Sequence, residues 1–63
     1  MKITYKLFAH TSPESSVDNF EKACADADYM PYEQEKAMAK YVGSEIELTV
    51  TFDTELKSFE VTF

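Results

Sequence analysis

The sequence predicts an α+β fold, a two-layer sandwich in which two helices pack on one face of a three-stranded, mainly antiparallel sheet. Hydrophobic residues alternate with a period of two near both ends of the chain and recur with helical spacing between them, which gives the order β-α-α-β-β. The chain has 63 residues, of which 44% are hydrophobic and one is a glycine. This length and composition predict a single folded domain, 1–63. The order of the strands within the sheet stays open.

The first strand is predicted over residues 2–10, with one face that we expect to be buried: Ile3, Tyr5, Leu7 and Ala9. Two helix starts follow it. Ser12 can act as N-cap with Pro13 at the first helical position, or Thr11 can act as N-cap in a capping box that ends at Glu14. Both alternatives place Glu14 where the helix dipole favours a negative charge.

The first helix is predicted to run from Pro13 to about Tyr29, because Pro31 ends or bends a helix just before it. Its apolar arc defines an expected buried face: Val17, Phe20, Ala23, Cys24, Ala27 and Met30. The second helix is predicted from about 32 to 42, with Gly43 at the C′ position that closes it. We expect four of its residues on the inner face: Ala37, Met38, Tyr41 and Val42.

A β-hairpin is predicted after residue 44, where the period returns to two. A four-residue loop at 54–57 would set three cross-strand pairs on one side: Phe52 with Phe59, Val50 with Val61 and Leu48 with Phe63. With Ile46, these residues form the expected inward face, so Phe63 is predicted to lie in the core. If the helices form a hairpin, the first strand is antiparallel to the second and parallel to the third.

Charge is distributed unevenly along the chain. The net charge is −6, and arginine is absent. Residues 14–35 hold seven acidic residues and one lysine, which accounts for the whole net charge, while the acids and lysines elsewhere cancel. Direct binding of DNA or RNA is disfavoured, because it needs cationic contacts to phosphates.

Four carboxylates of the first helix fall within an arc of roughly 80° beside its apolar arc: Glu14, Asp18, Glu21 and Asp28. One interpretation is a solvated face that aids solubility. The other is a surface for a basic partner, in which spaced carboxylates imitate a row of phosphates. The corner after the helix carries Tyr29 and Tyr32, which either anchor an interface or pack between the helices. These six residues are the predicted partner-binding site.

Motifs for catalysis, metal binding or phosphate binding are missing from the sequence, so we expect no enzyme, no cofactor and no metal site. Cys24 and His10 are single, and Cys24 lies on the apolar arc, where a thiol is buried and unreactive. A third hypothesis is an accessory enzyme subunit or catalytic domain, which rapid alkylation of Cys24 in the folded protein would favour. A lone cysteine, with neither a membrane span nor a signal peptide, predicts a cytoplasmic protein.

In size, acidity and lack of catalytic motifs, the whole chain resembles small phage-encoded inhibitors of the anti-CRISPR and anti-restriction type, some of which mimic nucleic acids. The resemblance is compositional. It implies steric or charge-based blocking of a host machine that handles nucleic acid, with a larger protein or complex as partner, through its basic surface. The alternative is a strand-pairing or dimerisation module, in which an edge strand, 2–10 or 56–63, joins a partner strand or a second copy. Exposed Phe8 beside His10 would anchor that contact.

Overall fold

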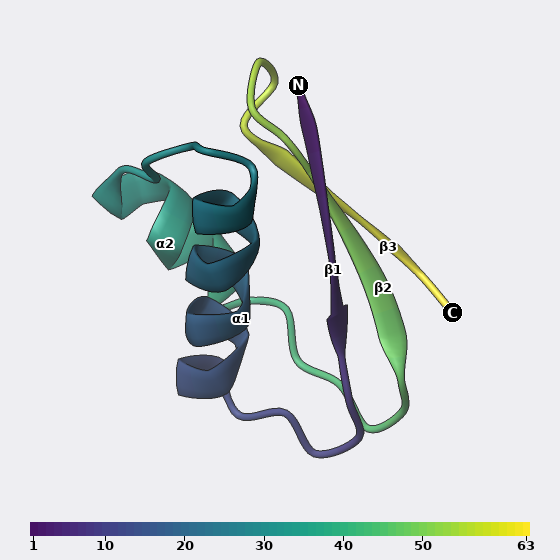
Figure 1. The fold of residues 1–63 in the computed structure, drawn as a ribbon. Coiled ribbons are helices and arrows are strands. Elements are labelled where there is room, and N and C mark those ends of the chain that lie inside the picture. The colour runs from purple at the N-terminus through teal and green to yellow at the C-terminus, as the bar shows by residue number, and fades with distance from the viewer.

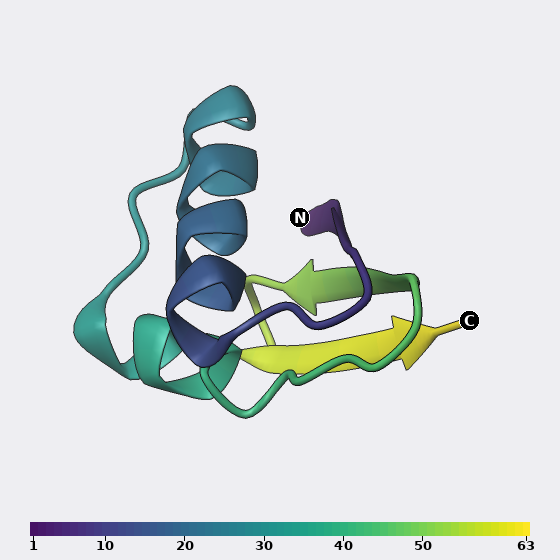
Figure 2. The same ribbon diagram turned by 90° about the horizontal axis from the view of Figure 1, so that it is seen from below.

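The helices and strands follow the predicted order. A computed structural model describes residues 1–63 and contains five elements: β1 (Lys2–Leu7), α1 (Pro13–Asp26), α2 (Glu33–Ala39), β2 (Leu48–Asp53) and β3 (Ser58–Thr62). Both helices lie on the same side of the sheet (Figures 1 and 2), as the predicted two-layer α+β fold requires. Neither helix has the length and apolar character needed to cross a bilayer.

The strands lie in the order β1-β2-β3, and each neighbouring pair is antiparallel. The predicted hairpin register is confirmed, with Phe52 opposite Phe59 and Val50 opposite Val61. The third expected pair lies beyond this ladder, because β3 ends at Thr62. The loop at 54–57 is fixed by Asp53, whose Oδ1 accepts hydrogen bonds from two successive backbone amides at 2.9 and 3.1 Å.

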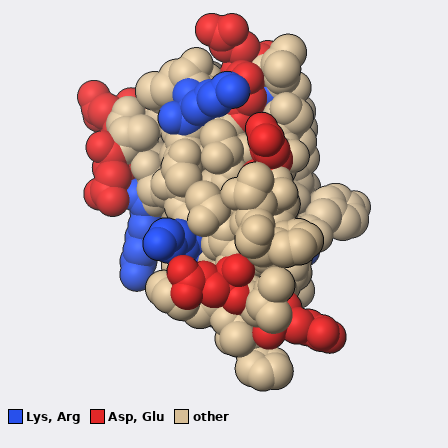
Figure 3. All heavy atoms as spheres, turned by 90° about the vertical axis from the view of Figure 1, so that its right-hand side faces the viewer, with Lys and Arg blue, Asp and Glu red and all other residues tan.

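The core is centred on Phe20 of α1, which is fully buried. Its ring lies edge-on to Phe52 at 5.1 Å between centroids and also contacts Tyr5 and Phe59. The predicted inward residues of β1 up to Leu7 are buried, as are Leu48, Val50 and Phe52 of β2. Figure 3 looks at the opposite side of the sheet, where charged side chains lie around the border and uncharged atoms fill most of the middle.

Four residues predicted to face inward are exposed instead: Ala9, Ile46, Val61 and Phe63. β1 ends at Leu7 and the chain turns at His10 (φ 64°), so Ala9 lies outside the alternation. Ile46 precedes β2 in the same way. Val61 and Phe63 differ, because their alternation is right but the helical layer does not extend over the end of β3 (Figure 1). The prediction that Phe63 is core is therefore wrong.

The first helix begins as one of the two alternatives predicted and ends earlier than expected. Ser12 is the N-cap, with its Oγ accepting from the Ser15 amide at 3.1 Å. The helix ends at Asp26 in a Schellman motif, with Asp28 in the left-handed region (φ 57°) and the Tyr29 N–H donating to the Cys24 carbonyl at 2.8 Å. Pro31 is therefore not the terminator.

The buried row of α1 is Ser16, Phe20 and Cys24, with Val17, Ala23 and Ala27 packed partly against the core. Met30, predicted on this face, is 82% exposed because it follows the Schellman turn. Ser16 was not predicted to be buried; its Oγ donates to the Ala39 carbonyl at 2.8 Å and ties the two helices together.

The second helix is shorter than predicted and presents a different face. Its buried residues are Glu35 and Ala39, with Val42 just beyond the helix, whereas Ala37 and Tyr41 are exposed and Met38 is half-buried. A charged residue takes the central inner position, which hydrophobic spacing does not indicate. The C′ role predicted for Gly43 is also wrong, because this glycine has no positive φ and the helix closes through tight turns at 40–42.

Candidate functional site

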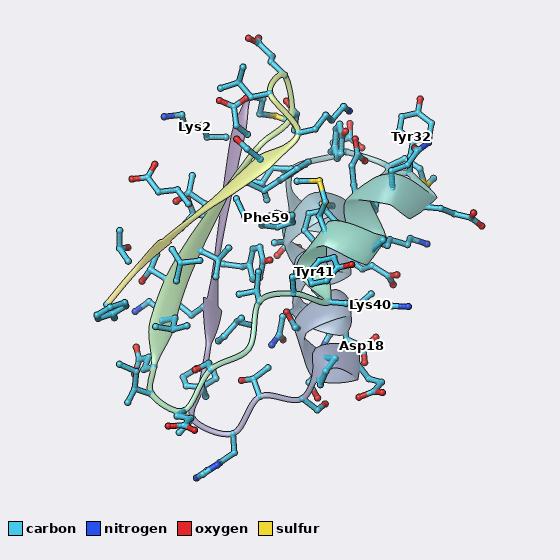
Figure 4. The ribbon with its side chains drawn as sticks, turned by 180° about the vertical axis from the view of Figure 1, so that it is seen from behind. Lys2, Asp18, Tyr32, Lys40, Tyr41 and Phe59 are labelled. Atoms are coloured by element: carbon cyan, nitrogen blue, oxygen red, sulfur yellow. The ribbon has the colours of Figure 1, made fainter.

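The acidic face is defined here as Glu14, Asp18, Glu21 and Asp28. The first three project from successive turns of α1, and Asp28 lies in the turn after it. Glu14, Asp18 and Asp28 are exposed and belong to none of the ion pairs in the structure. Figure 4 shows Asp18 on the side of α1 away from the sheet. The acidic face is thus presented to solvent.

Part of the acidic face borders a hollow of about 420 Å³ at the corner between the helices. Glu21, Asp28 and Tyr29 line it, together with Ala25, Met30, Pro31 and Lys36. Lys36 Nζ lies 3.4 Å from Glu21 Oε1, so Glu21 is the one member of the acidic face with a cation beside it. The structure therefore brings Glu21, Asp28 and Tyr29 to one hollow and leaves Glu14 and Asp18 nearer the start of α1.

Asp28 occupies a backbone position that costs stability. Its φ of 57° is in the left-handed region, where a residue with a Cβ is less stable than glycine. It also places a carboxylate beside the C-terminal end of α1, where the helix dipole favours a cation. The Asp28 side chain is exposed, lines the hollow and takes part in none of the ion pairs.

The tyrosine corner is joined to the β2–β3 hairpin through Glu35. The Tyr29 hydroxyl donates to Glu35 Oε1 at 2.8 Å, and the Tyr32 amide donates to Glu35 Oε2 at 2.6 Å. Lys57, in the hairpin loop, donates to the same Oε1 and to the Tyr29 hydroxyl, the latter at 3.1 Å. We call these four residues the Glu35 cluster.

Ionisation of the Glu35 cluster follows from its contacts. Burial alone would raise the pKa of Glu35, which is 2% exposed, but donors from Lys57, the Tyr32 backbone and Tyr29 outweigh it and hold this pKa below its usual range. The Glu35 carboxylate raises the pKa of Lys57, and Tyr29 adds to that effect. Burial raises the pKa of Tyr29. The cluster is therefore a charged Glu–Lys pair with a neutral tyrosine.

The two predicted tyrosines have different environments. Tyr29 packs inward, with its ring 6.3 Å from that of Phe52 and its hydroxyl bonded within the fold. Tyr32 is 66% exposed, and Lys57 Nζ lies 5.6 Å from its ring centre. Tyr32 is thus the one available as an exposed aromatic contact, and Figure 4 shows it pointing outward at the corner.

Sequence reasoning missed Glu35 and Lys57 as partners of the tyrosine corner. One signal was present: Glu35 stands three residues after Tyr32, the spacing at which a carboxylate reaches back to an N-cap amide. Lys57 had no such signal, because it lies 22 residues further along the chain. Lys57 has a left-handed backbone (φ 55°) at the end of the hairpin loop, and its ammonium reaches Tyr29 and Glu35 at the corner.

The lone thiol lies in the core and not at a site. Cys24 is fully buried, and burial, with the carboxylates of Glu35 and Glu21, raises its pKa to about 11. His10 is exposed in the turn after β1. No group of three or more His, Cys, Asp or Glu side chains is placed to hold a metal ion. The acidic face with Tyr32 is therefore the candidate site.

The arrangement can act by surface contact, through the exposed carboxylates of the acidic face, the hollow that Glu21 and Asp28 line, and the exposed ring of Tyr32. Such a surface suits a protein with exposed lysine or arginine side chains. No protein-family model, no curated protein and no solved structure matches this chain.

Proposed function

We propose that this chain is a small protein-binding inhibitor or modulator that uses its acidic face to dock onto a basic surface of a larger protein complex. The observation that carries the proposal is the contrast within the charges: Glu14, Asp18 and Asp28 are exposed and unpaired, whereas Glu35 is bound within the fold. The chain would act without catalysis or cofactor, in the cytoplasm that the lone cysteine favours.

The target surface proposed is one that binds nucleic acid. Carboxylates on neighbouring turns of a helix lie about 5–6 Å apart, close enough to present a row of negative charge in place of phosphates. Bound there, the chain would block the partner sterically and by charge. This is what the compositional resemblance to phage-encoded anti-CRISPR and anti-restriction inhibitors, some of which mimic nucleic acids, implies. Tyr32 would supply the aromatic contact at the end of the row.

Asp28 supports a binding role over a purely solubilising one. A solubilising carboxylate can stand anywhere on the surface, but Asp28 stands at a left-handed position beside a helix C-terminus, where both backbone and dipole disfavour it. Residues that lower stability without a structural benefit gather at functional sites. Tyr29 contributes by holding the corner in place through Glu35.

The experiment is capture of partners from nuclease-treated host lysate on the immobilised chain, followed by a salt titration and by sequencing of the captured proteins. The test variant is the double substitution Asp18→Lys with Asp28→Lys. Its matched control, Glu55→Lys with Glu60→Lys, makes the same change in net charge at two exposed sites of the β2–β3 hairpin, outside α1 and the turn after it.

The expected result is a nucleic-acid-binding partner that withstands nuclease, is released as ionic strength rises and is lost in the test variant alone. Equal loss in both variants would show that net charge and not the acidic face determines capture. Retention of the partner by the folded test variant would overturn the proposal.

A further inference from the structure

β3 is an edge strand with an open outer side. It pairs with β2 on one side only, and in Figure 4, which views the sheet from the β3 side, no other element lies outside it. The opposite edge, β1, carries Lys2 and Lys6, the kind of charge that discourages edge-to-edge pairing. β3 has no lysine and no proline between Ser58 and Thr62. The two edges therefore differ in their readiness to accept another strand.

The backbone groups on the open side of β3 can be assigned from the ladder. The Thr54 amide donates to the Met1 carbonyl at 2.9 Å, in register with the β1–β2 pairing. Because bonding directions alternate along a strand, even-numbered residues of β2 bond to β1 and odd-numbered ones bond to β3. The odd positions Thr51 and Thr49 pair with Glu60 and Thr62. The N–H and C=O groups of Phe59 and Val61 consequently point outward.

Apolar side chains accompany these outward groups. Val61 is 40% exposed and Phe63, immediately past the strand, is 91% exposed. Both share the helix-side face with Phe59, but the helices leave this end of the strand uncovered. An open strand edge that carries an exposed phenylalanine on the helix side of the sheet is a surface that favours strand addition.

We propose that the occupant of this edge is a second copy of the chain, paired antiparallel β3 to β3 about a two-fold axis at Val61. Val61 then lies opposite the partner's Val61, and Phe59 lies opposite the partner's Phe63. The product is a continuous six-stranded sheet with all four helices on one side. Each exposed Phe63 gains the neighbouring copy's Phe59 as a packing partner, which its own chain does not provide.

Charge selects this register over the one shifted by a residue. Centring the axis on Glu60 would place two carboxylates directly opposite each other, which destabilises a strand pair. Centring it on Val61 places Glu60 opposite the partner's Thr62 and leaves no like charges face to face. Both registers bring outward backbone groups face to face, so the side chains decide between them.

The dimer is independent of the function proposed above and leaves the acidic face free, because α1 packs over β1 at the far side of the sheet. Two phenylalanines, two valines and the paired backbones bury on the order of 1,000 Å², the lower range of specific interfaces. Each copy carries a net charge of −6, so added salt is expected to strengthen the dimer, whereas it weakens acidic docking.

The test is sedimentation velocity of the full chain between about 10 µM and about 1 mM, a range suited to a weak self-association. We expect a concentration-dependent monomer–dimer equilibrium. Val61→Lys sets two ammonium groups opposite each other and should abolish the dimer. Thr62→Lys instead places a lysine opposite the partner's Glu60 in both symmetric pairs. It should lower the dissociation constant of the dimer by about 2-fold to about 30-fold. Thr4→Lys makes the same charge change on β1 and should tighten it less than Thr62→Lys.

Amide hydrogen exchange gives a second readout that needs no variant. The Val61 amide should gain protection as the concentration rises, whereas the Glu60 amide, bonded to β2 in the monomer, should not change. A monomer at every concentration, or a dimer that Val61→Lys leaves intact, would overturn the proposal. So would equal tightening by Thr62→Lys and Thr4→Lys, because the register would then be wrong.

Discussion

Glu35 shows how one buried carboxylate can organise a corner made of three chain segments. Its two oxygens accept from the start of α2, from the turn after α1 and from the hairpin loop. Each donor belongs to a different segment of the chain, and Tyr29 also packs against the core through its ring. A buried carboxylate is stable only with such partners, so the burial of Glu35 and the position of Lys57 depend on each other.

Replacing Glu35 with glutamine is expected to lower the free energy of unfolding by about 1–3 kcal/mol, because a neutral amide satisfies these donors poorly and leaves the ammonium unpaired. Glu33→Gln, two residues away at an exposed position, is the control and should change stability little. The measurement is the urea midpoint of both variants. Equal midpoints would mean that the Glu35 cluster adds no stability.

Among the elements, α1 shows most clearly how backbone geometry ends a helix. Its Schellman motif needs a left-handed residue at position 28, and Asp28 supplies it with strain that a glycine would not have. Asp28→Gly is therefore expected to raise the free energy of unfolding by about 0.5–1 kcal/mol. Asp28→Asn, which removes the charge and keeps a Cβ, separates the effect of the dipole from that of the backbone.

Thermal unfolding of the two variants measures this prediction, and partner capture measures its functional counterpart. If Asp28 belongs to the binding site, Asp28→Gly gives a more stable protein that captures less partner. A loss of stability on Asp28→Gly would instead show that the carboxylate has a structural role at the end of α1.

The elements differ in how far the sequence predicts them. Strand parity and hairpin register follow from alternation over adjacent residues, so Phe52 and Phe59 could be paired correctly. The end of α1 could not, because nothing in the sequence marks Asp28 as left-handed. The inner face of α2 was hidden because Glu35 is charged, and its cation comes from a distant loop. For the site, spacing placed the acidic face on α1, but only contacts showed that Tyr29 turns inward.

At the scale of the molecule, the charges divide into those that hold the fold and those that do not. Glu35 with Lys57 and Asp53 with its turn amides form the first group. Most of the acidic face belongs to the second group, the charges that do not hold the fold together. The helical layer, shorter than the sheet it covers, creates a further division, since it packs β1 and leaves the end of β3 bare. The two proposed contacts therefore use separate surfaces.

This division predicts that stability is lost at both ends of the pH range for separate reasons. The pKa values of Glu35 and Asp53 are lowered in the folded chain, the latter by the backbone amides of the hairpin loop. Their contribution is present above the unfolded values of about 4 and is lost as the pH falls through the folded ones. Glu35→Gln should flatten this acid limb in urea unfolding measured from pH 7 to pH 2, and an unchanged slope would contradict the assignment.

The loss of folding stability at alkaline pH is assigned to Cys24. Its pKa is raised from 9.0 to about 11, so the folded chain keeps a proton that the unfolded chain releases. The stabilisation is present below pH 9 and is lost as the pH rises towards 11, by about 3 kcal/mol in all. Cys24→Ala lowers stability at neutral pH by leaving a cavity, and its stability should fall less steeply between pH 9 and 11. Parallel curves for the two proteins would show that the buried thiol does not titrate with unfolding. They would leave Tyr5, Tyr29 and Lys57 as the groups responsible, since all three also have raised pKa values.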